Sequence, residues 1–441
     1  MRDIALVGFF AWAIVQAFKN TWSGALLWTW LSTMNPHRLA YGFAVNLPFA
    51  ATTAGVTLLS IIWNRHKVRL PADPAVFALV LFLLWTCVTT VFAFYPEQSS
   101  NDLVVTLKIQ VMTLVCIAAL RERKHIEYFI WVIVVSIGFY GVKGGIFAIA
   151  SGGTSRVWGP ASSFIEGNNE LGLAIVMTIP LMNYLRIVSV RPWVRLGLLV
   201  AMLLSSTAAL ATQSRGAFLA ISAMGLVLWW RSKQKVLGAF VILAAAISLL
   251  AFMPASWDER MQTIGSYQQD ASAMGRITAW ELAYKVANDR ITGAGFLIER
   301  ADIYARYGQD TNLVLTAHSI YFQALGEQGW IGLALFLSMG ALSFWYASQM
   351  RRQALARPET MWLRDLAGMV QVSMVGYAVG GAFLSLTYLD LPYNIMVVLL
   401  ACKYWLREER WKTETTGAFG STSGEAAKAL SISANARVAK R

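Results

Sequence analysis

His318 has the clearest capacity for chemistry in this chain. It follows 254–317, the long polar interruption of an otherwise apolar sequence, and it opens the motif His318-Ser319 followed by 327–332 (Glu-Gln-Gly-Trp-Ile-Gly). Histidine is the side chain whose ordinary pKa suits proton transfer near neutral pH. We therefore expect His318 to act as a general base at the membrane interface. An interfacial histidine with an ordinary hydrogen bond is the alternative that the spacing leaves open.

Two arginines are candidates for the same site. Arg215 lies between two apolar runs, where a charged side chain costs about 2.5 to 3.5 kcal/mol on insertion scales and is usually paired or functional. Arg276 lies within 254–317. Guanidinium groups bind phosphate oxygens bidentately, so both side chains suit a diphosphate. The plainer alternatives are snorkelling of Arg215 to the lipid headgroups and a solvated surface charge for Arg276.

Five further side chains are candidate substrate-binding groups. Lys143 lies inside an apolar run beside three glycines that permit close backbone approach. Asn168 and Asn169 begin an apolar run, where a helix N-cap is the plainer interpretation and the binding of sugar hydroxyls the sharper one. Asp390 lies at the outer end of a span, with a structural ion pair as the alternative. The full set is Lys143, Asn168, Asn169, Tyr321 and Asp390.

Several kinds of site lack a signature in this sequence. It contains no Gly-rich phosphate loop, no nucleotide-binding fingerprint and no His-Glu-x-x-His motif, and the outer loops carry no dense carboxylate cluster. We therefore expect no metal site, no cofactor and no coupling to ATP.

Composition places these residues in a membrane protein. Of 441 residues 57% are hydrophobic and 14% charged, and the mean hydropathy is +0.52, which is too apolar for a soluble protein. The net charge of +13 comes from Lys and Arg in short runs on every second connection between apolar segments. This pattern is typical of cytoplasmic loops rather than of nucleic-acid binding. We expect an all-α, polytopic integral membrane protein with no nucleic-acid partner.

The apolar runs predict about twelve membrane crossings, with both termini in the cytoplasm. About 20 apolar residues make one crossing. We expect residues 4–34 to make one crossing, and two crossings are the alternative. With both termini in the cytoplasm, the loop 254–317 lies on the periplasmic side of the membrane. The remaining predicted spans are 40–63, 75–95, 103–120, 127–150, 170–187, 195–213, 215–230, 236–253, 328–349, 364–386 and 390–406.

The same pattern divides the chain into four parts. Residues 1–253 carry transmembrane helices one to nine, 254–317 form a periplasmic loop domain, 318–406 carry helices ten to twelve, and 407–441 form a disordered cytoplasmic tail. Within the loop domain we expect an amphipathic helix on the membrane surface or over a cavity. Its stripe, which follows Gly275-Arg276, consists of Ile277, Trp280, Tyr284 and Ala287.

These motifs in this order resemble the bacterial O-antigen ligase and polymerase superfamily. The sequence 215–219 is similar to its R-x-x-x-L motif, and 275–280 and the His318 motif match the pattern that follows. The N-terminal third, with Trp-Thr-Trp at 28–30 and Asn-Pro-His-Arg at 35–38, resembles the exosortase-associated branch of O-glycosylation ligases. One departure is Gly-Asn-Asn at 167–169, where many relatives carry an Asp-x-Asn-like element.

The resemblance implies transfer of an O-antigen glycan en bloc from undecaprenyl diphosphate to a lipid A-core sugar, at the periplasmic face of the bacterial inner membrane. It implies an inverting, metal-independent enzyme of the integral-membrane (GT-C-like) glycosyltransferase type, with membrane lipids around it. His318 would be the base, and Arg215 and Arg276 would stabilise the diphosphate. An O-antigen polymerase and a protein O-oligosaccharyltransferase use the same donor. A lipid-linked-glycan transporter is the non-enzymatic alternative.

Overall fold

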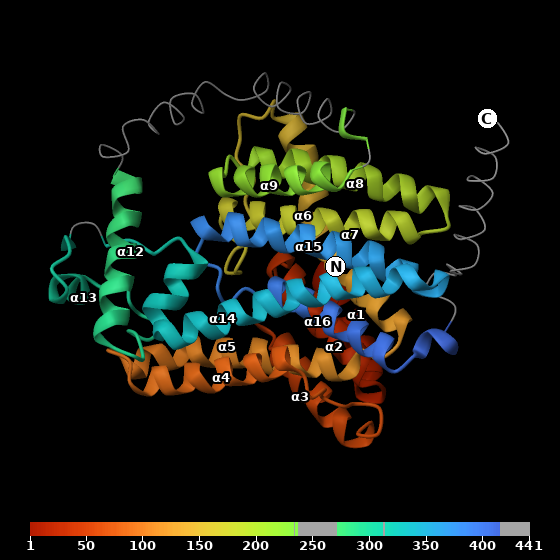
Figure 1. The fold of residues 1–441 in the computed structure, drawn as a ribbon, viewed down its shortest axis with the longest axis horizontal. Coiled ribbons are helices and arrows are strands. Elements are labelled where there is room, and N and C mark those ends of the chain that lie inside the picture. The colour runs from red at the N-terminus through yellow and green to blue at the C-terminus, as the bar shows by residue number, and fades with distance from the viewer. Residues whose placement is uncertain (233, 237–270, 312–313, 415–441) are drawn as a thin grey trace.

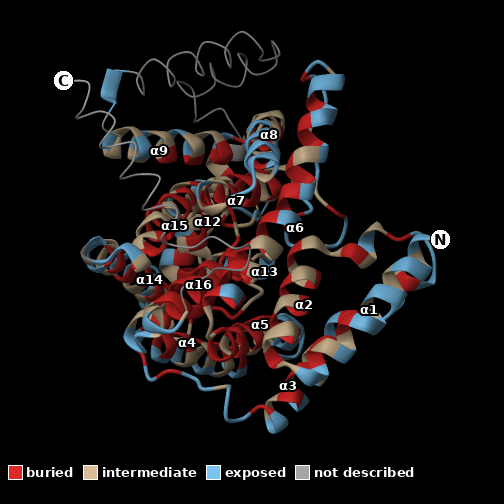
Figure 2. Cartoon of the chain, turned by 90° about the vertical axis from the view of Figure 1, so that its right-hand side faces the viewer, coloured by how far each residue is buried: buried red, intermediate tan, exposed pale blue. Residues whose placement is uncertain are grey.

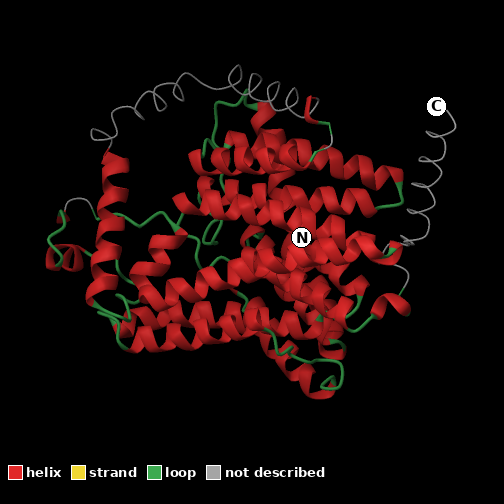
Figure 3. Cartoon of the chain, viewed as in Figure 1, coloured by secondary structure: helices red, strands yellow, loops and turns green. Residues whose placement is uncertain are grey.

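The regular structure of the described residues is entirely helical (Figure 3). The computed structural model describes residues 1–232, 234–236, 271–311 and 314–414 (Figure 1). The predicted all-α class is confirmed for these residues. The predicted span 236–253, the first part of the loop domain at 254–270 and the tail beyond residue 414 lie almost wholly outside them.

Most of the long helices run side by side and form a bundle (Figure 1). Within the described part of the chain, seven segments are long and apolar enough to cross a membrane. The chain is therefore a multi-pass membrane protein, and the further crossings of the expected twelve remain a prediction. The seven are α4 (Pro74–Val91), α5 (Pro96–Ala119), α6 (Arg123–Ala150), α7 (Asn168–Val188), α8 (Pro192–Ala211), α14 (Ile320–Gln353) and the segment Pro358–Phe383, which contains α15 (Met361–Gly380).

The N-terminal region folds as a helical hairpin beside a third, shorter helix. α1 (Arg2–Lys19) and α2 (Thr21–Met34) meet at the extended residue Asn20. Across the hairpin, the ring centroids of Phe9 and Trp30 are 5.1 Å apart. The predicted span 40–63 is wrong in its first part, because the helix there is only α3 (Phe49–Trp63). The preceding residues form short 3-10 turns, which Asp3 ties to α1 by accepting from two of their backbone N–H groups.

Small residues let the bundle helices approach closely, as is usual between membrane helices. A Cβ at Gly145 of α6 would lie 2.2 Å from the Leu204 carbonyl oxygen of α8, and one at Gly141 would meet Ser205. In the same way Gly376 of α15 faces Met224 of α9 (Arg215–Arg231). These contacts fix α8 against α6 and α9 against α15.

The core of the bundle contains α7 and α16 (Asp390–Arg407), which appear almost wholly in the buried colour (Figure 2). The outer face of α8 is apolar as well, since Leu196 and Leu203 are each 62% exposed. Exposed leucines on the surface of a bundle of apolar helices indicate contact with lipid.

α12 (Ala271–Asp289) lies across one end of the bundle (Figure 1), and the short α13 (Ala301–Arg306) lies beside it. Its buried face comprises Ala279, Leu282, Ala283, Val286 and Ala287. The predicted stripe is therefore only partly buried: Ala287 belongs to this face and Trp280 is half-buried, whereas Ile277 and Tyr284 are 41% and 51% exposed. Leu282, Ala283 and Val286 pack into a separate small core with residues of 294–304.

Candidate active site

His318 and Arg276 come together where α12 meets the segment that leads into α14. A Cβ at Gly275 would lie 2.2 Å from Leu315 Cδ1, so the glycine lets this extended segment lie directly on α12. The positive charge of Arg276 then acts on His318, and both side chains are half-buried. Two residues that are 42 positions apart in the sequence therefore share one site.

Ala317 fixes the backbone next to His318 from both sides. Trp280 Nε1 donates to the Ala317 carbonyl oxygen at 2.6 Å, and its ring stacks on Phe322 at 4.9 Å. On the other side, Glu299 accepts a hydrogen bond from the Ala317 backbone. His318 itself has φ 41°, a left-handed conformation that few non-glycine residues adopt. Trp280 and Glu299 thus stabilise a backbone conformation that is otherwise unfavourable.

Burial lowers the pKa of His318 below its usual value, and the positive charge of Arg276 lowers it further. Both effects disfavour the imidazolium form, because a partly desolvated cation beside another cation is unstable. The imidazole is therefore neutral near pH 7 and able to accept a proton.

Glu299 is a member of this site that the sequence did not single out. Burial raises its pKa to about 7, an effect that the hydrogen bond from the Ala317 backbone opposes. Nothing local in the sequence marks this residue, since it is one of several acidic residues in the loop. Only the folding of 294–304 against α12 brings it to Ala317.

Arg215 lies at the same end of the bundle as His318. It is the exposed first residue of α9, and Ser214 caps this helix by accepting from the Ala217 N–H. A positive charge in the first turn opposes the helix dipole, so the position is not explained by helix stability. Close packing of Gly216 against Gly380, and of Gly381 against Ile320, joins the start of α9 to the start of α14.

The Glu327 motif builds a polar core under the first turns of α14. The Glu327 carboxylate accepts from Tyr388 Oη at 2.7 Å and from Gln323 Nε2 at 3.1 Å. Gln328 Nε2 donates to the same Tyr388 oxygen at 2.8 Å, and the Gln328 carbonyl accepts from Trp85 of α4. Because these groups satisfy one another, they hold the start of α14 in a fixed position.

Gly329 allows the loop after α12 to dock on α14. Its φ of 68° breaks the helix, which frees the carbonyl groups of Gly326 and Glu327 to accept from the N–H groups of Ala294 and Gly295. A Cβ at Gly329 would lie 2.2 Å from the Ile291 carbonyl oxygen. The glycine is therefore required both by its conformation and by the close approach of the loop.

The predicted substrate-binding residues lie in different places. Lys143 is on the exposed side of α6, and its glycine neighbours pack against α8 rather than against a ligand. Asp390 is buried on the side of α16 that faces Ser32 of α2. The structure does not bring these two residues to His318.

The asparagine pair lies near Arg215 and does not form an N-cap. The N-cap of α7 is Gly167, and Asn168 is the first helical residue. Asn168 Nδ2 donates to the Thr212 carbonyl oxygen at 2.7 Å, which ties α7 to the turn before α9. Its amide is therefore used in packing, whereas Asn169 is half-buried beside it.

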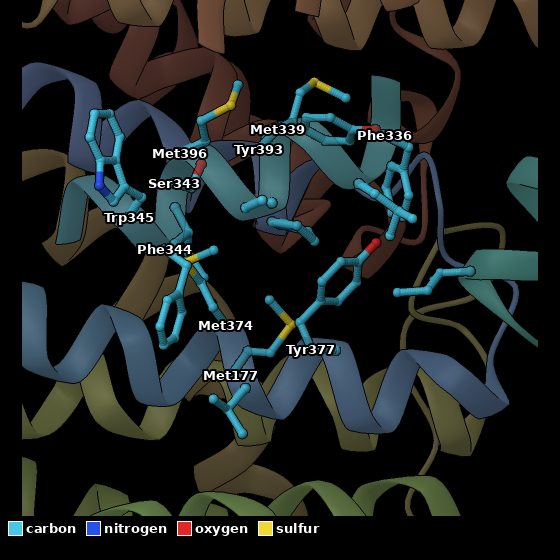
Figure 4. Close-up of a pocket in the computed structure, with 18 of the residues that line it drawn as sticks. Met177, Phe336, Met339, Ser343, Phe344, Trp345, Met374, Tyr377, Tyr393 and Met396 are labelled. Atoms are coloured by element: carbon cyan, nitrogen blue, oxygen red, sulfur yellow. The ribbon is translucent and has the colours of Figure 1, made fainter. Parts of the chain in front are cut away.

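The lining of a large apolar cavity begins at Ile320, two residues after His318. Its volume is about 610 Å³, and it lies between α14, α15 and α16 (Figure 4). Tyr321 lines its beginning, with its hydroxyl donating to the Ala378 carbonyl oxygen at 2.7 Å, and Ser348 lines the far end. Gly329 breaks α14 between these two positions, and at about 1.5 Å per residue the lining from Phe336 to Ser348 covers roughly 18 Å of the second part of the helix. Phe344 and Trp345 are 39% and 52% exposed, so the cavity opens on the side of the bundle.

Comparison with known families agrees with this arrangement. Residues 200–337 match the family described as O-antigen ligase (Wzy_C), and residues 1–190 match a family of unknown function (DUF5935). No curated protein matched the chain. The first match contains Arg215, Arg276 and His318. Residues 200–337 are thus similar to the O-antigen ligase family, and the region that precedes them is similar to DUF5935.

Proposed function

We propose that this chain transfers an O-antigen glycan en bloc from undecaprenyl diphosphate to a lipid A-core sugar at the periplasmic face of the inner membrane. One observation carries the proposal: His318 and Arg276 share a site next to the lining of a large apolar cavity, within the region similar to the O-antigen ligase family. The base would take the proton of a hydroxyl acceptor, and the cation would bind a diphosphate. The apolar cavity would hold a prenyl chain.

In this reaction His318 is the general base. The neutral imidazole takes the proton of the acceptor hydroxyl as the hydroxyl oxygen forms its bond to the anomeric carbon. The bond between that carbon and the diphosphate oxygen breaks on the opposite face, and the electron pair stays on the undecaprenyl diphosphate. The configuration of the anomeric carbon is therefore inverted.

Arg276 and Arg215 stabilise the negative charge that grows on the leaving diphosphate. Arg276 is already beside His318, and Arg215 lies at the start of a helix joined to the same end of the bundle. Two guanidinium groups bind phosphate oxygens in a bidentate manner and supply positive charge where it is needed. The proposed reaction therefore needs no metal ion.

The apolar cavity suits the prenyl chain of the donor. Its lining includes methionines Met177, Met339, Met374 and Met396, whose flexible side chains adapt to an irregular apolar ligand (Figure 4). The side opening lets a lipid enter from the bilayer without leaving an apolar environment. Because the lining of the cavity begins at Ile320, a chain within the cavity would present its diphosphate near His318 and Arg276.

The test is transfer by the purified protein in lipid nanodiscs, with an undecaprenyl-diphosphate-linked glycan as donor. The wild type and His318→Ala are compared, and donor binding is measured separately. We expect the variant to bind the donor and to transfer no glycan. Full transfer by His318→Ala would remove this residue from the mechanism.

The acceptor is tested in the same assay with three arms. Lipid A-core tests the proposed ligase, a second lipid-linked glycan tests a polymerase, and a protein with Ser or Thr acceptors tests an O-oligosaccharyltransferase. The last arm also tests the exosortase-associated branch that the N-terminal motifs indicate. Movement of the donor across a bilayer without transfer to any acceptor would favour a transporter.

A further inference from the structure

A second large cavity lies at the opposite end of the bundle from His318. Its volume is about 670 Å³. α5 and α16 both start near the loop domain and Tyr388 and both end at this cavity, so its ligand would be a whole helix length from the proposed active site. Its lining comes from the α1–α2 junction, the end of α3, the α5–α6 junction and residues that follow α16.

The lining of this cavity is strongly cationic. Lys67, Arg69, Arg121, Lys124 and Arg410 face two carboxylates, Glu122 and Glu408, which leaves an excess of three positive charges with histidines neutral. Loops with basic residues are common at the cytoplasmic ends of membrane helices. This topological preference explains why the loops carry basic residues. It does not explain why basic residues from several loops line the same cavity.

Three of the five cations lie close to carboxylates: Lys124 is 2.8 Å from Glu122, Arg410 is 2.8 Å from Glu408, and Arg121 also faces Glu408. Within the described part of the chain, Lys67 and Arg69 have no carboxylate partner. The side chain of Arg121 is only 11% exposed, and Glu408 is 3.4 Å away. Burial lowers the pKa of Arg121 from its usual value, and although Glu408 opposes this shift, the charges of Arg410 and Arg69 add to it. A group of like charges held this close is stabilised by a bound anion.

The floor of the cavity is polar and buried. His125 lines it with a side chain that is 7% exposed, stacks on Trp22 at 4.3 Å, and has no hydrogen-bond partner for its Nδ1 within the described residues. The N-terminus of α2, at Thr21 and Trp22, also lines the cavity and has no side-chain cap. Helix N-termini and basic side chains together are a common arrangement for phosphate.

We propose that this cavity binds a phosphate-bearing anion, with Lys67, Arg69 and Arg121 contacting the phosphate oxygens. The ligand is either the headgroup of an anionic lipid or a soluble phosphate compound. Most of the lining lies within the DUF5935 region, so the proposal gives that region a binding function. The site is distinct from the one that contains His318.

The test uses Lys67→Gln with Arg69→Gln in the full-length protein. Both side chains are exposed and make no hydrogen bond or ion pair within the described part of the chain, so the fold should tolerate the change. The matched control is Arg191→Gln with Arg352→Gln, which removes two exposed cations outside this cavity. Arg215→Gln serves as a third variant, because it affects only the proposed donor site.

In the first arm, sodium diphosphate is titrated calorimetrically into each protein in nanodiscs of phosphatidylcholine. In the second, the proteins are extracted from nanodiscs that contain phosphatidylglycerol, and retained lipids are counted by native mass spectrometry. Loss of two charge-assisted hydrogen bonds should weaken binding at least about tenfold in the cavity variant only. A loss of diphosphate binding in the first arm identifies a soluble phosphate compound as the ligand. A loss of retained phosphatidylglycerol in the second arm identifies a lipid headgroup.

Binding of neither probe by the wild type, or an equal loss in the control variant, would overturn the proposal. Loss of diphosphate binding in Arg215→Gln alone would assign all diphosphate binding to the donor site and would likewise exclude the cavity as a site for soluble diphosphate. The His318→Ala transfer assay is independent of these results, so either proposal is able to fail without the other.

Discussion

Trp280→Phe should impair catalysis while an aromatic ring still packs at this position. The substitution removes the Nε1 donor that lies 2.6 Å from the Ala317 carbonyl oxygen. It keeps an aromatic ring to stack on Phe322. We therefore expect the α12–α14 contact to persist while the backbone before His318 loses one of its two anchors.

The size of the effect follows from the burial of Ala317. This residue is 4% exposed, so its carbonyl would be left without a partner, at a cost of about 1 to 3 kcal/mol. The left-handed conformation of His318 costs about 1 to 2 kcal/mol in addition. Relaxation of the backbone relieves both costs and moves the imidazole. The two costs add to about 2 to 5 kcal/mol, so the fraction of active molecules should fall roughly 30- to 5,000-fold.

The assay is steady-state glycan transfer in nanodiscs, with kcat and KM for the donor measured separately. We expect a lower kcat and an almost unchanged KM, because the phosphate-binding arginines are untouched. The matched control is Trp330→Phe, which removes another indole donor between the same two helices, the 3.0 Å bond to Asn288 Oδ1. An equal fall in both variants, or a change in KM alone, would refute the proposed role of Trp280.

Three further outcomes are expected. Arg276→Gln removes a charge that disfavours the imidazolium, so the pKa of His318 should rise and the acidic limb of the pH–rate profile should move to higher pH; an unmoved limb would contradict this. Arg215→Lys keeps the charge but loses the bidentate fork, so kcat should fall at least about tenfold, and wild-type activity would indicate simple snorkelling. Gly329→Ala should lower the unfolding temperature, since its Cβ would lie 2.2 Å from a carbonyl oxygen, whereas Gly340→Ala in the same helix meets nothing within 4 Å and should not.

The helical class and the main helices could be predicted from the sequence. The length of an apolar run indicates a membrane helix, and Pro or basic residues indicate where the helix ends, and both signals are local. α4 and α8 begin at Pro74 and Pro192, where the missing N–H of proline costs nothing. The spacing of the Arg215, Arg276 and His318 motifs was also sufficient to indicate the family. All of this information lies within short stretches of chain.

The buried face of α12 could not be predicted in the same way. Its sequence offers two apolar stripes, and periodicity reports that a stripe exists but not which one a neighbour covers. The folding of 294–304 covers the stripe with Leu282 and Val286 and leaves Tyr284 exposed.

The sequence alone thus determined most of the helices and which residue types are available for chemistry, because those properties depend on neighbours along the chain. The tertiary structure decided that Arg276 lies beside His318, that Glu299 reaches Ala317, and that Lys143 points away. These outcomes depend on contacts between segments far apart in the chain, such as the close approach that Gly275 permits at Leu315. No local pattern encodes them, since each requires two elements to pack before the side chains meet.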